Sequence, residues 1–129
     1  MIFGIGCDIV RVSRFEKWVK NPDILKRYFN ARELHSDGGE KMSAERLSEY
    51  YAVRFAAKEA FSKALGTGLQ GFSLTDIYIL KEKNGKPRME VTGEAKDVLE
   101  RLCGAESGVF VSLSHEKEYA IANVVIERG

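Results

Sequence analysis

Five apolar residues in the stretch from Arg54 to Gly68 recur at steps of three and four, which is the spacing of a buried helix face. They are Ala57, Ala60, Phe61, Ala64 and Leu65. Upstream, Ser43 is suited to the N-cap position, and Gly66 and Gly68 are flexible residues of the kind that end a helix. The pattern predicts one long helix from about Ala44 to Leu65.

Alternation of apolar and polar positions predicts strands in other parts of the chain. These segments are Ile2–Val10, Asp76–Lys83, Pro87–Val91, Val109–Ser114 and Tyr119–Glu127. Asn84-Gly85 is typical of a tight hairpin turn between the second and third of them. Thr92 is expected to cap a further helix, whose apolar stripe stops at Gly104.

The segment between the first strand and the long helix predicts short helices. Ser13 can cap one over Arg14–Lys20, and Asn21-Pro22 breaks it and places proline at the first position of the next. Asn30-Ala-Arg-Glu33 fits a loose capping arrangement for another short helix. Asp37-Gly38-Gly39 predicts a loop before the long helix.

The order of these elements is β-α-α-α-β-β-α-β-β, with antiparallel hairpins. This order predicts an α+β fold, in which a small antiparallel sheet packs with one long and several short helices. With 129 residues, the chain is expected to form a single domain over 1–129.

The composition argues against several classes of protein. Twenty Lys and Arg against nineteen Asp and Glu give a net charge of +1, so no global charge favours a nucleic-acid partner. No apolar run approaches the roughly 18–20 residues of a membrane span, and Asp8 interrupts any signal-peptide core. Cys7 and Cys103 lie in apolar contexts and are expected to be buried and reduced. We therefore expect a cytoplasmic protein with no membrane partner.

The charge is nevertheless uneven along the chain. From Arg11 to Arg32 there are seven basic and two acidic residues, so this region carries a charge near +5. If its segments are helical, four of the basic residues can share one face: Arg14, Lys17, Lys20 and Arg27. Such a face is either an ordinary solvated surface or a binding surface for an acidic partner.

The first strand is expected to be buried, and Asp8 is an unusual residue to find on it. Ile5, Cys7 and Ile9 alternate with two glycines and Asp8, and the glycines leave open space on the side of Asp8. An unpaired buried carboxylate is costly. Asp8 is therefore either a strand-end residue that bonds a turn or caps a helix, or a metal ligand or general base.

The long helix carries a second acidic candidate, Glu59. Taken alone, Glu59 and Lys63 are four residues apart and would form a surface ion pair worth ~0.3–0.5 kcal/mol. Together with Asp8, however, Glu59 suits Mg²⁺, which prefers oxygen ligands and keeps positions open for water and phosphates. The cations that would suit a polyphosphate substrate near this ion are Arg46, Arg54, Lys63 and His115.

Four sequence blocks occur in the order found in one enzyme family. They are Gly4-Ile-Gly-Cys-Asp8-Ile-Val, Arg54-Phe-Ala-Ala-Lys-Glu-Ala-Phe-Ser-Lys-Ala-Leu-Gly-Thr-Gly68, Asn84-Gly-Lys-Pro87 and Ser112-Leu-Ser-His115. With these blocks the chain resembles the holo-acyl-carrier-protein synthases, the small bacterial type of 4′-phosphopantetheinyl transferase. The resemblance runs from residue 4 to about residue 127, which is essentially the whole chain.

The resemblance implies the α+β fold of this family and a Mg²⁺-dependent transfer of phosphopantetheine from coenzyme A to a serine of apo-acyl carrier protein. Adenosine 3′,5′-bisphosphate would be released, and the reaction would support fatty acid biosynthesis. Asp8 and Glu59 would ligate Mg²⁺, and Lys63 would contact the phosphates and assist the leaving group. The residues assigned to coenzyme A are Arg46, Arg54, Lys63, Gly66, Gly68 and His115.

The resemblance also implies two kinds of protein contact. The chain would form a homotrimer with active sites at the subunit interfaces. The acidic carrier would dock on the first helix, with Arg14 as its main contact and Lys17, Lys20 and Arg27 in support. Because the carrier supplies the nucleophile, Ser112 and Ser114 are expected to be structural strand residues.

Two other functions remain possible from the residues alone. The same carboxylates could serve a Mg²⁺-dependent phosphohydrolase that acts on a nucleotide. The basic region could instead belong to a non-catalytic module that binds RNA or acidic proteins, although no stacking platform for bases is evident. In a transferase, either a metal-ordered water or a nearby carboxylate could remove the proton from the serine.

Overall fold

The computed structural model describes residues 1–35 and 42–129, and the loop predicted at Asp37-Gly38-Gly39 lies outside this part. The strands are β1 (Ile2–Arg11), β2 (Ile77–Lys81), β3 (Pro87–Val91), β4 (Gly108–His115) and β5 (Tyr119–Glu127). The α-helices are α1 (Pro22–Tyr28), α2 (Ala44–Leu65) and α3 (Gly93–Cys103). Short 3-10 helices are formed by Val12–Phe15, Trp18–Lys20, Ala31–Glu33 and Leu74–Asp76.

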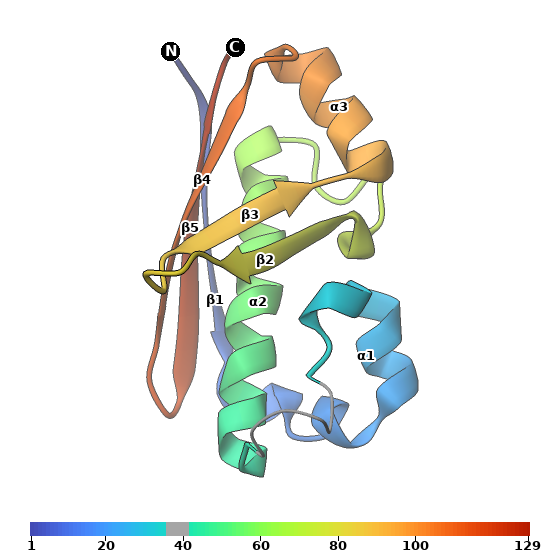
Figure 1. Ribbon diagram of the computed structural model, residues 1–129, viewed down its shortest axis with the longest axis vertical. Helices are drawn as coiled ribbons and strands as arrows, with labels where there is room; N and C mark the ends of the chain where they lie inside the picture. Colours follow the sequence, from blue (N-terminus) through green and yellow to red (C-terminus); the bar gives the residue numbers. More distant parts are fainter. Residues whose placement is uncertain (36–41) are drawn as a thin grey trace.

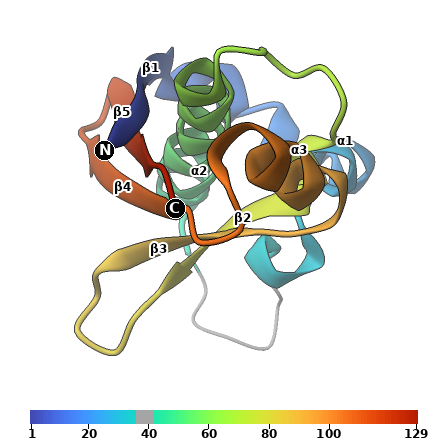
Figure 2. The ribbon, with the colours of Figure 1, turned by 90° about the horizontal axis from the view of Figure 1, so that it is seen from above.

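Helix α2 is the central element of an α+β arrangement, as predicted. The strands pair antiparallel in two groups, a three-stranded sheet in the order β1-β5-β4 and a separate hairpin of β2 and β3. Figure 1 shows α2 running along the three-stranded sheet, with the β2–β3 hairpin crossing it. Seen from above in Figure 2, α2 lies between that sheet and α3, and the tip of the hairpin projects outward. No helix within the described residues is long and apolar enough to cross a membrane.

The ends of α2 are those that the sequence predicts. The Ser43 hydroxyl accepts a hydrogen bond from the Arg46 amide at 3.1 Å, which caps the N-terminus. At the other end, Gly66 has a φ of 82° and its amide donates to two carbonyl groups of the last turn. The apolar stripe predicted between Ala57 and Leu65 is buried along its whole length.

Strand β1 approaches α2 with its glycine face, which corrects one prediction. Gly4 and Gly6 do not leave open space, because the backbone of α2 occupies it. Ile5 and Ile9 point away from the helix and are 65% and 60% exposed. The strand is therefore buried on one face only, and Cys7, expected to be buried, is exposed as well.

The helix predicted over Arg14–Lys20 is wrong. Two 3-10 helices take its place, and Ser13 lies inside the first of them instead of capping an α-helix. The aromatic rings in this segment pack onto α2, with the centroids of Phe15 and Trp18 at 5.5 and 5.3 Å from that of Phe55. This packing outweighs local helix propensity. Beyond it, Asn21 caps α1 through its side chain, with proline at the first turn as predicted.

Thr92 occupies the N-cap position of α3, but its side chain makes no capping hydrogen bond. Its hydroxyl donates instead to the carbonyl of Asp76 at 2.8 Å. The Asp76 carboxylate accepts a hydrogen bond from the amide of Ala95 at 3.4 Å. A residue distant in sequence thus supplies the acceptor that the first turn of α3 needs.

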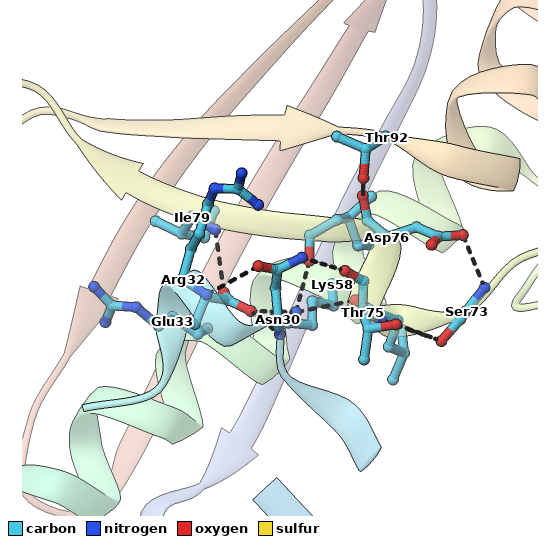
Figure 3. Close-up of polar contacts among 12 residues, drawn as sticks. Asn30, Arg32, Glu33, Lys58, Ser73, Thr75, Asp76, Ile79 and Thr92 are labelled. Carbon is cyan, nitrogen blue, oxygen red and sulfur yellow. Dashed lines mark hydrogen bonds and ion pairs between the residues drawn. The ribbon is translucent and has the colours of Figure 1, made fainter. Parts of the chain in front are cut away.

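A fully buried ion pair joins α2 to the 3-10 helix Ala31–Glu33, and both of its side chains also bond the backbone of β2 (Figure 3). The Lys58 ammonium donates to Glu33 Oε1 at 2.5 Å and to the carbonyls of Leu74 and Ile77 at 3.0 and 2.6 Å. The other Glu33 oxygen accepts from the Ile79 amide at 3.1 Å. Burial lowers the pKa of Lys58, and the Glu33 carboxylate opposes that shift. These contacts fix the position of α2 relative to β2.

Candidate active site

Strand β1 and helix α2 bring Asp8 and Lys63 together. The Lys63 ammonium donates to Asp8 Oδ1 at 2.8 Å and to the carbonyl of Cys7 at 3.1 Å. The ion-pair partner of Lys63 is thus a residue 55 positions away, and not Glu59 one turn along the helix. The pair is half exposed on its lysine side, with 54% of the Lys63 side chain accessible to solvent.

Glu59 lies close enough to Asp8 for the two carboxylates to repel each other. Partial burial, followed by the Asp8 charge, raises the pKa of Glu59, while Lys63 and Arg14 act in the opposite direction. Two neighbouring carboxylates are a feature expected of a cation site, and here the Lys63 ammonium neutralises part of their charge. Arg14, predicted to contact a partner protein, is therefore also near the acidic residues.

The donor set around these carboxylates fits Mg²⁺. Within the described residues there is no group of three or more His, Cys, Asp and Glu side chains that could enclose a metal ion. Two carboxylates would leave coordination positions open for water and for phosphate oxygens, which is how Mg²⁺ is usually bound with phosphorylated substrates. Asp8 and Glu59 are therefore suited to an ion that is shared with a ligand.

A second cluster forms around the N-terminal half of α2. A pocket of about 270 Å³ contains three of the predicted ligand-binding cations, Arg46, Arg54 and His115. The β2–β3 turn contributes Gly85 and Pro87 to the same pocket. The block Asn84-Gly-Lys-Pro87 and the block that ends at His115 thus meet in space, as expected of parts of one site.

Arg54 is the most unusual residue of this pocket. Its guanidinium lies 3.6 Å from the centre of the Tyr50 ring, and Nη1 donates to the Tyr50 carbonyl at 3.2 Å. The residue is only 7% exposed, and its buried Nε has no hydrogen-bond partner. Desolvation lowers its pKa, and Tyr50 and Glu33 oppose that shift. Because Glu33 is already bonded to Lys58, an anionic ligand would satisfy Arg54.

The two clusters lie on different faces of α2. Arg54 and Glu59 are five residues apart, which turns their side chains about 140° from each other around the helix. Arg46 and Glu59 are separated by about 20 Å along the axis. Of the residues described, Asp8, Glu59 and Lys63 do not line the pocket of Arg46 and His115. One chain therefore does not bring all the predicted site residues together.

Gly66 and Gly68 lie at the C-terminal end of α2, beyond Lys63. Both have positive φ angles, 82° and 66°, which explains the choice of glycine by backbone conformation alone. A Cβ on either residue would have no neighbour within 4 Å in this chain. The surface above these glycines is open.

The predicted docking residues are exposed, but they lie on separate elements. Arg14 and Lys20 belong to the two 3-10 helices, Lys17 lies between them, and Arg27 is on α1. The guanidinium of Arg14 rests 5.0 Å from the centre of the Phe55 ring, which orients it. These positions form a basic surface without forming one helical face.

A larger cleft, of about 890 Å³, was not predicted from the sequence. It lies between the 3-10 helices and the first turn of α2. Its charges are mixed, with Lys20 and Arg46 facing Glu16 and Glu49 among others. It contains neither Asp8 nor Glu59, so the paired carboxylates are a better guide to the chemistry than the size of a cleft.

The sequence pattern of the 4′-phosphopantetheinyl transferase superfamily matches residues 4–124. A holo-acyl-carrier-protein synthase from Treponema denticola is 47% identical over 127 residues, covering 98% of this chain and 99% of the relative. The chain belongs to the holo-acyl-carrier-protein synthase family. A synthase from Geotalea daltonii, 45% identical over 134 residues, covers 99% of this chain and all of the relative.

Solved structures agree with this family assignment. The Bacillus anthracis holo-acyl-carrier-protein synthase, crystallised in complex with coenzyme A (3′,5′-ADP), matches with a TM-score of 0.80 and 38% identity. The match covers 100% of this chain and 99% of that one. The α+β fold and the enzyme class predicted from the sequence are confirmed: the chain is a phosphopantetheinyl transferase that acts from coenzyme A on acyl carrier protein.

Proposed function

We propose that Asp8 and Glu59 hold Mg²⁺ for the transfer of phosphopantetheine to the serine of the carrier. The observation that supports this most strongly is that Asp8 on β1 and Glu59 on α2 are near enough to interact: partial burial, and then the Asp8 charge, raises the pKa of Glu59. When bound, Mg²⁺ neutralises charge on the phosphates of coenzyme A. The other side chains of the site have to position the phosphates of coenzyme A and the incoming serine hydroxyl of the carrier.

Lys63 supplies an exposed positive charge beside this pair. Its ammonium bonds Asp8, and because 54% of the side chain is accessible to solvent it can also contact a phosphate oxygen of the substrate. We assign Lys63 to the phosphate that leaves with the nucleotide. No nucleophile is required of the chain, because the hydroxyl comes from the carrier.

The pocket of Arg46, Arg54 and His115 is assigned to the nucleotide part of coenzyme A. The buried charge of Arg54, whose Nε has no hydrogen-bond partner, supports an anionic ligand there. Gly66 and Gly68 are assigned to the same substrate because their surface is open and lies beyond Lys63. The exposed basic positions around Arg14 are assigned to the acidic carrier, and the nearness of Arg14 to Glu59 would bring that carrier to the reacting phosphate.

A homotrimer with shared active sites accounts for two further observations. The outer face of the three-stranded sheet exposes large apolar side chains, Ile5, Ile9 and Phe110 among them. The two clusters of site residues lie on different faces of α2. Burial of the apolar face against neighbouring copies could bring the Arg54 pocket of one chain to the carboxylates of the next. In this proposal each chain is a single domain over 1–129, and the trimer acts in the cytoplasm.

Mass spectrometry of apo-acyl carrier protein tests the proposed site. Incubated with coenzyme A and Mg²⁺, the wild-type chain should add one phosphopantetheine group, whereas Glu59→Ala should lower the rate by about 10³-fold or more. Glu100→Ala, which removes an exposed carboxylate from α3, is the matched control and should retain full activity. If Glu59→Ala transfers phosphopantetheine at the wild-type rate, Glu59 is not a ligand of the metal ion. Hydrolysis of coenzyme A without gain of mass on the carrier would favour a phosphohydrolase.

A further inference from the structure

Strand β1 meets α2 through backbone contacts alone at two positions. A Cβ on Gly6 would lie 1.9 Å from the carbonyl oxygen of Ala60 and 2.7 Å from the amide nitrogen of Ala64. A Cβ on Gly4 would lie 2.0 Å from the carbonyl oxygen of Ala64. Both glycines lie in extended strand, so close approach, and not an unusual backbone angle, explains them. Any larger residue at either position must separate the strand from the helix.

The Gly6 contact joins segments that are next in sequence to the two carboxylates of the proposed metal site. Gly6 is two residues before Asp8, so both point to the same face of β1. Ala60 follows Glu59 directly in α2. The hydrogen bond from Lys63 to Asp8, 2.8 Å long, crosses the same strand–helix boundary. The distance between the backbones at Gly6 therefore sets how far apart Asp8 and Glu59 can be.

We propose that Gly6 is a positioning residue for the metal site. The proposal rests on the assigned role of Asp8 and Glu59. Restoring a 3.0 Å contact for a Cβ at residue 6 requires a movement of about 1 Å, since the Cβ would otherwise lie 1.9 Å from an oxygen. Functional groups usually tolerate displacements of about 0.5 Å, and Mg²⁺ requires near-ideal octahedral geometry with oxygens at roughly 2.0–2.1 Å. Glycine at residue 6 thus keeps both carboxylates within reach of one ion.

Binding of Mn²⁺, used in place of Mg²⁺, tests the proposal without measuring turnover. Electron paramagnetic resonance in the presence of coenzyme A should show about tenfold or more weaker binding to Gly6→Ala. Glu100→Ala, which removes an exposed carboxylate from α3, is the control. We expect that control to bind as the wild type does. Equal binding by Gly6→Ala and wild type would overturn the proposal.

A longer carboxylate provides a rescue that a merely structural role for Gly6 would not show. Asp8→Glu extends the side chain by one C–C bond, about 1.5 Å, which is comparable with the displacement expected from Gly6→Ala. In the wild-type background Asp8→Glu should weaken Mn²⁺ binding about fivefold or more, because the longer side chain displaces its oxygens from the separation that Gly6 sets. In the Gly6→Ala background the same change should strengthen binding. Weaker binding in both backgrounds would overturn the proposal.

Two further variants distinguish an error in the proposed metal site from an error in the role of Gly6. If Glu59→Gln leaves Mn²⁺ binding unchanged, the proposed metal site is wrong. If Glu59→Gln abolishes binding while Gly6→Ala does not weaken it, the site stands and the positioning role of Gly6 is wrong. Should Gly6→Ala not fold, Asp8→Glu alone decides, since unchanged Mn²⁺ binding by that variant would contradict a tightly set separation.

Discussion

Glu59 is a carboxylate whose ionised form opposes folding. Its pKa is raised by partial burial and by the Asp8 charge, so the folded chain favours the protonated form. For a carboxyl of this kind, the stabilising contribution is complete below its unfolded pKa and is lost as the pH rises through its folded pKa. At neutral pH, without metal, ionised Glu59 therefore lowers the free energy of unfolding.

Replacing this carboxylate should stabilise the metal-free protein while removing its activity. Glu59→Gln is expected to have a higher Tm than wild type near pH 7, and the difference should vanish near pH 4, where Glu59 is protonated. Thermal melts across this range, in the presence of a chelator, measure the effect. Glu100→Gln on α3 is the control, and an equal gain in that variant, or a gain that grows toward acid pH, would contradict the explanation.

Arg14 should contribute to carrier binding more than to coenzyme A binding. Arg14→Gln removes the charge and keeps a polar side chain, and it should raise the KM for apo-acyl carrier protein on the order of tenfold. The KM for coenzyme A should change by less than about twofold, because that substrate is assigned to other residues. Steady-state kinetics with each substrate varied in turn measure both values.

The control for Arg14 is Arg101→Gln, which removes an exposed arginine from α3. It should leave both KM values unchanged. Equal increases for the two substrates in Arg14→Gln would show that the carrier docks elsewhere, or that Arg14 acts mainly through its electrostatic effect on Glu59.

Single residues explain where reasoning from the sequence succeeded and where it could not. Asp8 and Glu59 could be proposed as site residues because a carboxylate among apolar neighbours is costly without a partner, and their role as metal ligands stays a prediction. The partner of Lys63 could not, because a pattern along one helix proposes Glu59 and has no information on β1. The buried pair of Glu33 and Lys58 was missed for the same reason, although the capping pattern around Asn30 is confirmed.

At the level of elements, local signals located most boundaries. The caps of α2, the hairpin turn at Gly85 and the end of α3 at Gly104 depend on residues next to one another, and all are confirmed. The prediction of a helix over Arg14–Lys20 was wrong because the aromatic side chains of this segment pack onto a distant part of α2. The prediction that β1 is buried was wrong for one of its faces, because its exposed isoleucines are of a residue type usually found in the core.

The ion pair that links α2 to β2 yields a prediction at this scale. Lys58→Met leaves the Glu33 carboxylate buried and unpaired, so the free energy of unfolding should fall by about 3–5 kcal/mol. The double variant Lys58→Met with Glu33→Gln should recover much of that loss, because no buried charge remains uncompensated. Urea unfolding monitored by the single tryptophan, Trp18, measures these differences.

The exposed pair of Arg88 and Glu90 provides the matched control, since both side chains are at least a third accessible. Arg88→Met should change the free energy of unfolding by less than about 1 kcal/mol. If Lys58→Met were no more destabilising than Arg88→Met, the buried pair would not be a structural connection of this importance.

At the scale of the whole molecule, the apolar outer face of the three-stranded sheet calls for a partner surface. Ile9→Asp should dissociate the proposed trimer and abolish transfer, because it places a charge in the centre of that face. Sedimentation equilibrium measures the mass. Leu69→Asp, at an exposed leucine outside the sheet, is the control and should remain assembled. A wild-type assembly state in Ile9→Asp would show that this face is not the interface.

Helix α2 carries the carboxylates and the Arg54 pocket on different faces, and we propose that the two clusters meet between two copies of the chain. One variant would carry Glu59→Ala, and another would carry Arg46→Glu with His115→Ala. Each variant alone should be almost inactive. After the two are unfolded together and refolded as mixed trimers, about a quarter of the shared sites would have both clusters intact, so about a quarter of wild-type transfer should return. If the mixture stays as inactive as its components, the two clusters do not act across a subunit interface.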